Sequence, residues 1–545
     1  MTKPGPLEIE RREFLLAAGG ATLPAAIGCT TRPPPYAGTD LPAFELAEVS
    51  VAELREGLET GRWTTRFLAE SYIDRIDRTD AAGPALNSVI EVNPDALRDA
   101  EALDAERRAG KVRGPLHGIP VMLKDNIATA DRMQTTAGSL ALVGSKAPRD
   151  SGVAARLRAA GALLIAKTNL SEWANFRSRR STSGWSARGG LTLNPYFLDR
   201  NPCGSSSGSG VAVSAGIAPL AVGTETNGSI VCPSSVNGIV GVKPTVGLIS
   251  RSGIVPISHT QDTAGPMARS VPDAAAMLGA MAGRDPLDDA TARSEGRSHN
   301  DYTRFLAPGA LDGSRIGLLR EYWGRHAGID ALLDDATQAM RDAGAELVDL
   351  EPLPGLEETG RPGFEVMLYE FKAGLDRYLA DLEPGARVRS LEDVIRFNER
   401  NREAEMPYFG QDVLEAAAEK GPLDEAAYRD ALKASRDGCR QAIDATLEAS
   451  KLDAIFAPTT GPAWVTDLIH GDRSAFRGCS SAAARAGYPH VTVPGGLVFG
   501  LPVGVSFFGG AWSEPRLLAL AYAFERATSH RQAPRMLPGS ARTAA

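Results

Sequence analysis

The sequence is poor in the residues that build metal centres and disulfide frameworks. Its 545 residues include seven histidines and five cysteines, at positions 29, 203, 232, 439 and 479. No two cysteines form a Cys-x-x-Cys pair. This pattern argues against a structural zinc site and against a disulfide scaffold. A single disulfide stays open if the protein is exported.

The chain also has no excess of basic residues. Its formal net charge is −8, which argues against a nucleic-acid partner because such partners usually require a basic face. Hydrophobic residues make up 43% of the chain, and this length and composition allow a large buried core. The sequence gives no indication of the oligomeric state.

The N-terminal segment has the layout of an export signal. Arg11 and Arg12 precede a mildly apolar run at 14–27, which is too short to span a bilayer. This order is typical of a twin-arginine signal peptide, although the glutamates on either side of the arginines depart from the pattern. The stretch before Cys29 is similar to a lipoprotein cleavage site. The alternative is a disordered or helical arm.

We therefore predict a signal peptide at 1–29 and a Pro-rich tether at 30–45. The protein would be exported and would be periplasmic or anchored to the cell envelope. A lipid on Cys29 would be its sole contact with the membrane.

From residue 46 the sequence alternates between helix-like and strand-like segments. Apolar residues at helical spacing predict helices within 51–77, 95–110 and 419–451, and 283–305 is a polar surface excursion. Short apolar runs predict strands within 118–127, 162–170, 314–322, 452–460, 490–496 and 502–510, and 210–223 predicts a helix followed by a strand. We predict an α/β fold, a single large domain at 46–535 with a central mixed β-sheet covered by helices on both faces, and a tail at 536–545.

Three polar patches interrupt this pattern. The first is "LHGIPVMLKDNI" with Lys124, the second "NPCGSSSGSGVAVSAG" with Ser205, and the third "GTETNGSIVCPSS" with Ser229. Taken singly, a lysine after a strand is usually a solvated end and a Gly-Ser run is usually a linker or turn. However, Gly-Ser loops also expose N–H groups to a ligand, and a helix after Gly210 would direct its positive end at the same loop.

Familiar nucleotide-binding and hydrolase motifs fit these patches poorly. The glycines lack the Gly-Lys-Ser/Thr of a P-loop, and 208–213 does not match the dinucleotide pattern. Residues 204–208 match G-x-S-x-G, which would make Ser206 a nucleophile with His470, His490 or His530 as base. That motif requires a preceding strand, whereas 194–203 is a polar loop.

Together the three patches resemble the amidase signature family. The resemblance runs from about residue 46 to 528 and includes "HVTVPGGLVFGLPVGVSFFGGAWSEPRLLALAYAFE" near the C-terminus. The separation of Ser205 and Ser229 also matches the family. The resemblance implies Ser229 as the acylated nucleophile, Ser205 as a proton relay after a cis peptide bond, and Lys124 as the base. Lysine acts as a base only when neutral, so its pKa must be lowered by burial.

The resemblance also implies the oxyanion hole. The backbone N–H groups of Thr226, Asn227 and Gly228 match its donors, and the small residues there let the chain curl. Many members have Gly-Gly-Ser where this chain has Asn227-Gly228-Ser229. Asparagine adopts left-handed backbone more readily than most residues, so the turn can be retained.

Two features bear on the substrate. Many members carry Arg where Val231 stands, and its replacement suits a neutral substrate. "ETNGSIVCP" and the segment 365–382 are similar to the peptide amidases, which remove the C-terminal amide from peptides. Cys232 is interpreted as a small buried packing residue, and His117 and His259 as structural.

The resemblance implies a serine amidohydrolase that converts a peptide amide and water to a peptide acid and ammonia. It needs no metal and no cofactor, and its partner is a small-molecule or peptide amide substrate. Three alternatives stay open: the amidase subunit of a glutamine-dependent amidotransferase complex, an amidase acting on non-peptide amides, and a non-catalytic binding protein with the same fold.

Overall fold

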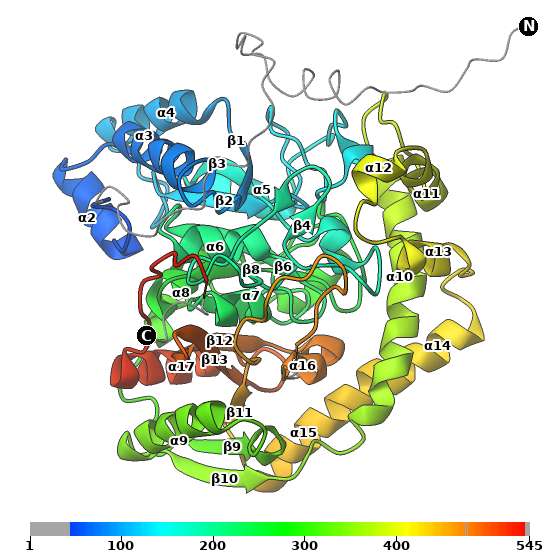
Figure 1. Ribbon diagram of the computed structural model, residues 1–545. Helices are drawn as coiled ribbons and strands as arrows, with labels where there is room; N and C mark the ends of the chain where they lie inside the picture. The colour runs from blue at the N-terminus through cyan, green and yellow to red at the C-terminus, as the bar shows by residue number, and fades with distance from the viewer. Residues whose placement is uncertain (1–43, 475, 477, 540–545) are drawn as a thin grey trace, which may run out of the picture. The chain divides into compact units, whose positions relative to one another are not determined.

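The predicted strands form one large mixed sheet (Figure 1). The computed structural model describes residues 44–474, 476 and 478–539. In these ranges, eleven strands lie in the order β1-β3-β2-β6-β8-β7-β12-β13-β11-β9-β10. Their bounds are β1 Val89–Val92, β2 Pro120–Lys124, β3 Leu163–Thr168, β6 Leu220–Glu225, β7 Val240–Lys243, β8 Thr263–Ala268, β9 Arg315–Leu319, β10 Glu346–Leu350, β11 Ala454–Pro458, β12 His490–Val498 and β13 Leu501–Phe508.

Several predictions fall on other parts of the chain. The signal peptide with Arg11, Arg12 and Cys29, the tether up to residue 43 and the tail from 540 lie outside the described residues. No helix in the described part is both long and apolar enough to cross a membrane.

The sheet is mixed because it contains both parallel and antiparallel strand pairs. Strand β2 pairs in parallel with β3 and β6, whereas β8, β7, β12 and β13 pair with their neighbours antiparallel. Strands β2, β3 and β6 are buried along their whole length, which explains their continuous apolar runs. Since β2 and β6 are parallel neighbours, their carboxyl ends meet at one edge and bring Lys124 close to Thr224.

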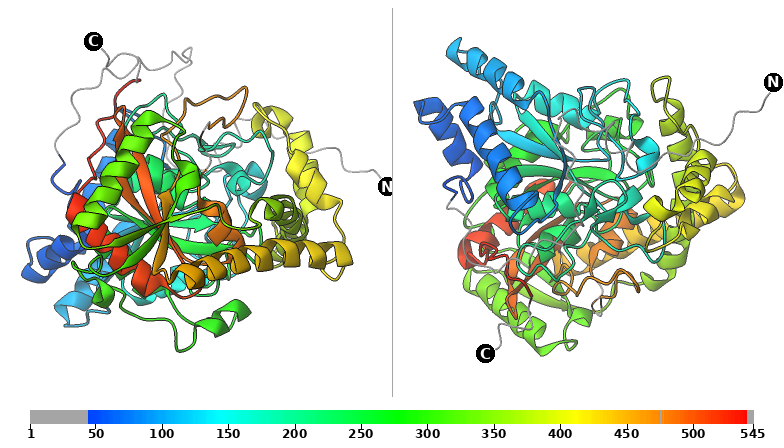
Figure 2. Two further views of the ribbon diagram at one scale, coloured as in Figure 1. Left: turned by 90° about the horizontal axis from the view of Figure 1, so that it is seen from below. Right: turned by 45° about the horizontal axis from the view of Figure 1, so that its top comes forward.

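Helices cover both faces of this sheet (Figure 2). On one face α6 and α7 contact each other and the central strands, and on the other α8, α9 and α17 do the same. The helix bounds are α2 Val51–Thr60, α3 Thr65–Arg75, α4 Ala96–Arg108, α5 Gly152–Ala159, α6 Ser207–Ser214, α7 Val231–Val236, α8 Val271–Met281, α9 Ala327–Asp342, α10 Gly360–Ala380, α11 Leu391–Arg400, α12 Arg402–Glu405, α13 Asp412–Ala418, α14 Ala426–Leu432, α15 Gly438–Ser450, α16 Ser480–Ala486 and α17 Glu514–Thr528. The central sheet with two helical layers confirms the predicted fold class.

The helix boundaries follow local capping chemistry that the apolar spacing did not reveal. The predicted helix at 51–77 is two helices, because Gly61 ends α2 in a left-handed conformation. Ser50 begins α2 with a capping box, in which its hydroxyl and the Glu53 carboxylate each accept a backbone N–H. The predicted helix at 419–451 is α14 and α15, joined by a π-helical turn at Lys433–Asp437.

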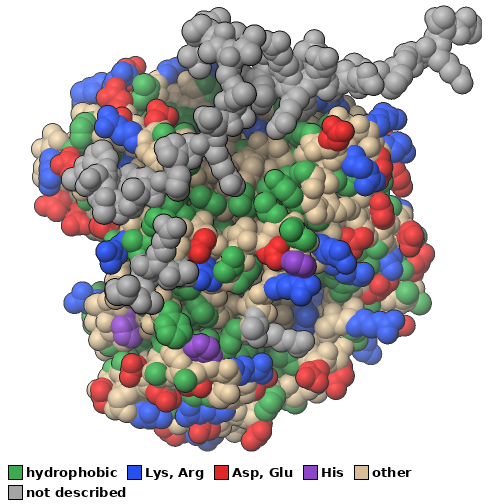
Figure 3. All heavy atoms as spheres, viewed as in Figure 1, with side chains coloured by type: hydrophobic (Ala, Val, Ile, Leu, Met, Phe, Trp, Pro, Cys, Tyr) green, Lys and Arg blue, Asp and Glu red, His purple; other side chains and the backbone are tan. Residues whose placement is uncertain are grey.

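A second apolar cluster lies beside the sheet. Helices α10, α11 and α13 bury Phe371, Leu375, Val394 and Leu414 against Trp173, which follows β3. This packing fixes α10 next to the loops at the carboxyl ends of β2 and β6. On the face shown in Figure 3, basic and acidic side chains are interspersed.

Candidate active site

Lys124 is the last residue of β2 and is fully buried. Its Nζ donates hydrogen bonds to Ser205 Oγ at 2.8 Å, Thr224 Oγ1 at 2.9 Å and Thr224 O at 3.2 Å. Burial lowers the pKa of the Lys124 ammonium to about 7, although the negative charges of Glu225 and Asp262 act in the opposite direction. Near neutral pH this lysine is therefore poised between its charged and neutral forms.

Ser205 lies in the loop before α6, directly after a cis peptide bond from Gly204. The cis bond agrees with what the family resemblance implies for this serine. Helix α6 begins at Ser207, which corrects the expectation of a helix that starts after Gly210. The Ser206 N–H donates to the Ser229 carbonyl at 3.2 Å. The structure thus brings Lys124, Ser205 and the Ser229 backbone together.

Ser229 precedes α7 and is 8% exposed, whereas Lys124 and Ser205 are fully buried. No hydrogen bond to or from its Oγ is present among the described residues. Of the three predicted groups, Ser229 is thus the most exposed.

Glu225 organises the chain on both sides of Ser229. It is the last residue of β6 and is 1% exposed. Its Oε1 accepts the Gly228 N–H at 2.8 Å, and its Oε2 accepts the N–H groups of Ile230 at 2.8 Å and Val231 at 3.0 Å. Three charge-assisted hydrogen bonds to one carboxylate hold the turn in a fixed curve.

A profile of the Amidase family matches residues 68–518. A probable amidase of Arabidopsis thaliana is 42% identical over 506 residues, which cover 91% of this chain and 93% of the relative. The crystal structure of the peptide amidase from Stenotrophomonas maltophilia superposes with a TM-score of 0.85 at 51% identity, covering 90% of this chain and 99% of the other. A glutamyl-tRNA(Gln) amidotransferase subunit of Symbiobacterium thermophilum is 34% identical, covering 89% of this chain and 98% of that relative.

The chain belongs to the amidase signature family. It is an enzyme of the class that hydrolyses amides. The resemblance inferred from the three serine and lysine patches is confirmed.

The oxyanion turn of this amidase departs from the prediction at one position. The Gly228 N–H already donates to Glu225, so it is not directed at a substrate. In the described chain, the N–H groups of Thr226, Asn227 and Ser229 have no acceptor. Of the N–H groups of this turn, that of Gly228 is therefore already satisfied and those of Thr226, Asn227 and Ser229 are not.

The left-handed residue of the turn is also different from the one expected. Gly228 has φ +84°, whereas Asn227 does not adopt positive φ. The Asn227 side chain instead accepts from Ser480 Oγ at 2.8 Å and donates to Ser481 Oγ at 3.2 Å. The amide therefore fixes the turn to the first residues of α16.

The sequence interpretation of Cys232 as a packing residue is wrong. Cys232 forms a disulfide with Cys203, with an S–S distance of 2.00 Å and Cα atoms 6.1 Å apart. The two cysteines are far apart in sequence, and the return of the chain through α6 and β6 brings them together. Cys439 and Cys479 are free and buried.

The structure does not support the G-x-S-x-G motif that would make Ser206 a nucleophile. Ser206 Oγ donates to Thr224 O at 3.1 Å and accepts the Thr224 N–H, and no histidine contacts it in the described part of the amidase. His490 is buried and bonded to Ser506, whereas His470 pairs with Asp467 in an exposed loop. The residues before Ser206 form a loop, so the strand that the motif requires is absent there.

The two histidines near the motifs differ in position. His117 is buried and its Nε2 lies 3.1 Å from Leu103 O, as expected of a structural residue. His259 is exposed, lies 3.5 Å from Glu370 and lines a cavity beside the turn at 226–229.

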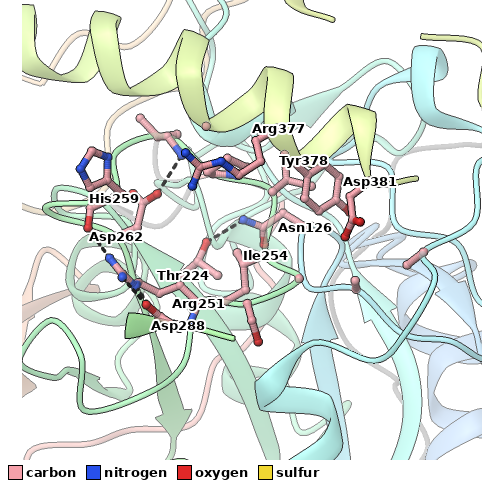
Figure 4. A pocket seen from close by; sticks show the side chains of 18 of the residues that line it. Asn126, Thr224, Arg251, Ile254, His259, Asp262, Asp288, Arg377, Tyr378 and Asp381 are labelled. Carbon is pink, nitrogen blue, oxygen red and sulfur yellow. Dashed lines mark hydrogen bonds and ion pairs between the residues drawn. The ribbon is translucent and has the colours of Figure 1, made fainter. Parts of the chain in front are cut away.

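A cavity of about 630 Å³ opens beside the turn. Thr224, Glu225 and Thr226 are among its lining residues. Figure 4 shows Asn126 and Ile254 near Thr224, with Arg377 and Tyr378 of α10 above them. Its volume lies within the usual range for small-molecule sites. The described residues include no group of three or more His, Cys, Asp and Glu side chains suited to a metal ion.

Sequence reasoning missed Thr224 and Glu225. Both stand at the end of β6, a few residues before Ser229, and both are buried. A glutamate that follows a buried apolar strand must find partners, because an unpaired buried carboxylate is costly. That rule could have identified Glu225 as a residue that orders the turn.

Proposed function

We propose that this amidase hydrolyses the C-terminal amide of peptides, giving a peptide acid and ammonia. The main support is the buried hydrogen bond between Lys124 Nζ and Ser205 Oγ, with the more exposed Ser229 nearby in the sequence of the site. The chain is also 51% identical to a peptide amidase. The segment 365–382, which is similar to the peptide amidases, supports this substrate class because its Gly374, Arg377 and Tyr378 line the cavity.

The reaction begins with a proton transfer. Neutral Lys124 takes the proton of Ser205, which takes that of Ser229 as Ser229 Oγ attacks the amide carbonyl. The N–H groups of Thr226, Asn227 and Ser229 stabilise the resulting oxyanion. As the C–N bond breaks, the proton returns through Ser205 to the leaving ammonia.

The second half uses water in place of serine. A water molecule gives its proton to Ser205 and Lys124 and attacks the acyl-enzyme on Ser229. Collapse of the second tetrahedral intermediate releases the peptide acid and restores the Ser229 hydroxyl.

Ammonia release from a panel of peptide amides, fatty-acid amides and small aliphatic amides tests this proposal. We expect the highest kcat/KM for peptide amides and loss of turnover in Ser229→Ala with the fold retained. Retained turnover in Ser229→Ala would overturn the nucleophile. A preference for a non-peptide amide would overturn the substrate class but leave the serine mechanism standing.

A role within an amidotransferase complex is the second candidate, because relatives named as amidotransferase subunits cover 89% of this chain. It predicts a stoichiometric protein partner and activity on glutamine. Purification of the native protein without a partner, together with hydrolysis of peptide amides and not of glutamine, would exclude it.

We also propose that the protein is exported. The twin-arginine layout at Arg11 and Arg12 supports this, and so does the Cys203–Cys232 disulfide, since disulfides persist in oxidising compartments. Cell fractionation of the full chain should recover it outside the cytoplasm, and Arg11→Lys/Arg12→Lys should retain it inside. Recovery of the unmodified chain in the cytoplasm would contradict export, and equal export of both proteins would contradict the role of the two arginines.

A further inference from the structure

The disulfide joins the two loops that carry the serines. Cys203 stands two residues before Ser205, and Cys232 stands three residues after Ser229. Both serines therefore lie inside the covalent ring that the bridge closes.

The other links between these loops are hydrogen bonds. The Ser206 N–H donates to Ser229 O at 3.2 Å, and Asn237 Nδ2 donates to Pro202 O at 2.9 Å. The disulfide is thus the covalent restraint on how far the segment 202–207 can move from the segment 228–237.

The surroundings of the bridge hold its two ends in place. Cys203 is buried with Tyr196, Phe197 and Val236, and Cys232 packs against the same cluster. The Cys203 N–H donates to Asn201 Oδ1 at 2.8 Å, and its carbonyl accepts the Ser207 hydroxyl at the start of α6. Because both cysteines are held by these contacts, removal of the bridge should change the positions of the two loops.

We propose that the Cys203–Cys232 disulfide positions Ser205 against Ser229 for proton transfer. The inference rests on the proposed serine mechanism. Ser205 is already fixed on the lysine side by its 2.8 Å hydrogen bond from Lys124. On the Ser229 side, no side-chain hydrogen bond of the described residues fixes the Ser229 hydroxyl. The backbone of that loop must therefore set the distance, and the bridge restrains that backbone.

A purely stabilising disulfide would have a different signature. It would lower the unfolding temperature when removed and leave kcat unchanged at temperatures where the protein stays folded. A positioning disulfide lowers kcat in the folded protein and leaves KM little changed, because most of the cavity lining, including Arg251, Ile254 and Arg377, lies outside the ring that the bridge closes.

The decisive variant is Cys203→Ala/Cys232→Ala, with Cys439→Ala as the matched control. Cys439 is a buried free thiol of α15 that lies outside the described site. We measure kcat and KM at about 25 °C together with the labelling rate of Ser229 by a fluorophosphonate reagent. We expect the double variant to lose about tenfold or more in kcat and in labelling rate, with KM within about twofold, since small misplacements of reacting groups are costly. Cys439→Ala should match the unmodified protein.

Equal kcat and labelling rate in the folded double variant would overturn the proposal. If the double variant does not fold, dithiothreitol is applied to the native protein. It forms its own cyclic disulfide while Cys203 and Cys232 become thiols, which a thiol reagent counts. Activity and labelling should then fall as two thiols appear and recover on reoxidation, and unchanged values with two new thiols would also overturn it.

The labelling rate separates this inference from the proposed function. It reports the reactivity of Ser229 without any amide substrate, so it decides the role of the bridge even if peptide amides are not hydrolysed. Failure of the proposed substrate class would appear in the ammonia panel alone.

Discussion

Lys124 and Lys167 lie at the ends of two neighbouring parallel strands and have different surroundings. Both are fully buried, and their strands β2 and β3 pair directly. Burial lowers the pKa of Lys124 to about 7 and that of Lys167 to about 8. Yet Lys124 donates to the Ser205 hydroxyl, whereas Lys167 donates to the Ile127 carbonyl and the Thr135 hydroxyl.

Burial is therefore not what distinguishes Lys124, the proposed base, from Lys167. Both lysines donate to a carbonyl oxygen and to a hydroxyl group, and the partners of Lys167 lie in the segment that follows β2. Ser205 can give as well as accept a proton, and it lies beside the Ser229 backbone. Three fully buried lysines, including Lys243, thus share one physical property, and the partner determines the role.

The largest effect should come from removing each lysine in turn. We expect Lys124→Met to lower kcat by about 10³-fold, because no other group takes the serine proton. Lys167→Met should keep kcat within about tenfold. Ammonia release at saturating substrate measures kcat, and circular dichroism verifies that each variant is folded. Comparable losses of kcat in the two variants would show that the two lysines do not differ in their importance for the reaction.

The next effect concerns the two hydroxyl partners. Ser205→Ala should lower kcat by about 10²-fold or more with KM little changed, since the relay between Lys124 and Ser229 is lost. Thr135→Val removes the equivalent partner of Lys167 and should leave kcat within a few-fold. Steady-state kinetics of both variants on one peptide amide tests the pair. A larger loss of kcat in Thr135→Val than in Ser205→Ala would show that the relay serves Lys167 and not Lys124.

The pH dependence should follow Lys124 and not Lys167. The neutral lysine is the active form, so log kcat/KM should fall by about one unit for each pH unit below 7 and level off above it. The same acidic limb should appear in Lys167→Met. A limb centred near pH 8 that disappears in Lys167→Met would reverse the assignment.

Much of this site could be predicted from the sequence because short apolar runs carry its polar residues. Lys124 ends such a run, and the spacing of Ser205 and Ser229 is specific enough to group three distant patches. The sheet was predictable for the same reason, since β2, β3 and β6 are apolar throughout.

The parts that could not be predicted depend on contacts between distant segments. The bridge of Cys203 to Cys232 requires α6 and β6 to fold back on each other. The hydrogen bond of Gly228 to Glu225 depends on a turn whose left-handed residue is Gly228 and not Asn227. The wall that α10 provides to the cavity comes from residues more than a hundred positions after Ser229.

The smallest effect is on stability, and it tests the lowered pKa that the buried lysines share. An unfolded lysine has its ordinary pKa of about 10.5, so between pH 8 and 10 each of these lysines binds more protons in the unfolded chain than in the folded one. Lys124, Lys167 and Lys243 should therefore each add an increase in the free energy of unfolding with pH in this window, whereas buried tyrosines with raised pKa values contribute in the opposite direction. Lys167→Met removes one contribution, so urea unfolding at about pH 8 and about pH 10 should show a shallower rise than in the unmodified protein. Parallel slopes would mean that Lys167 keeps its proton in the folded state. Its role would then be that of a buried cation held by Ile127 O and Thr135.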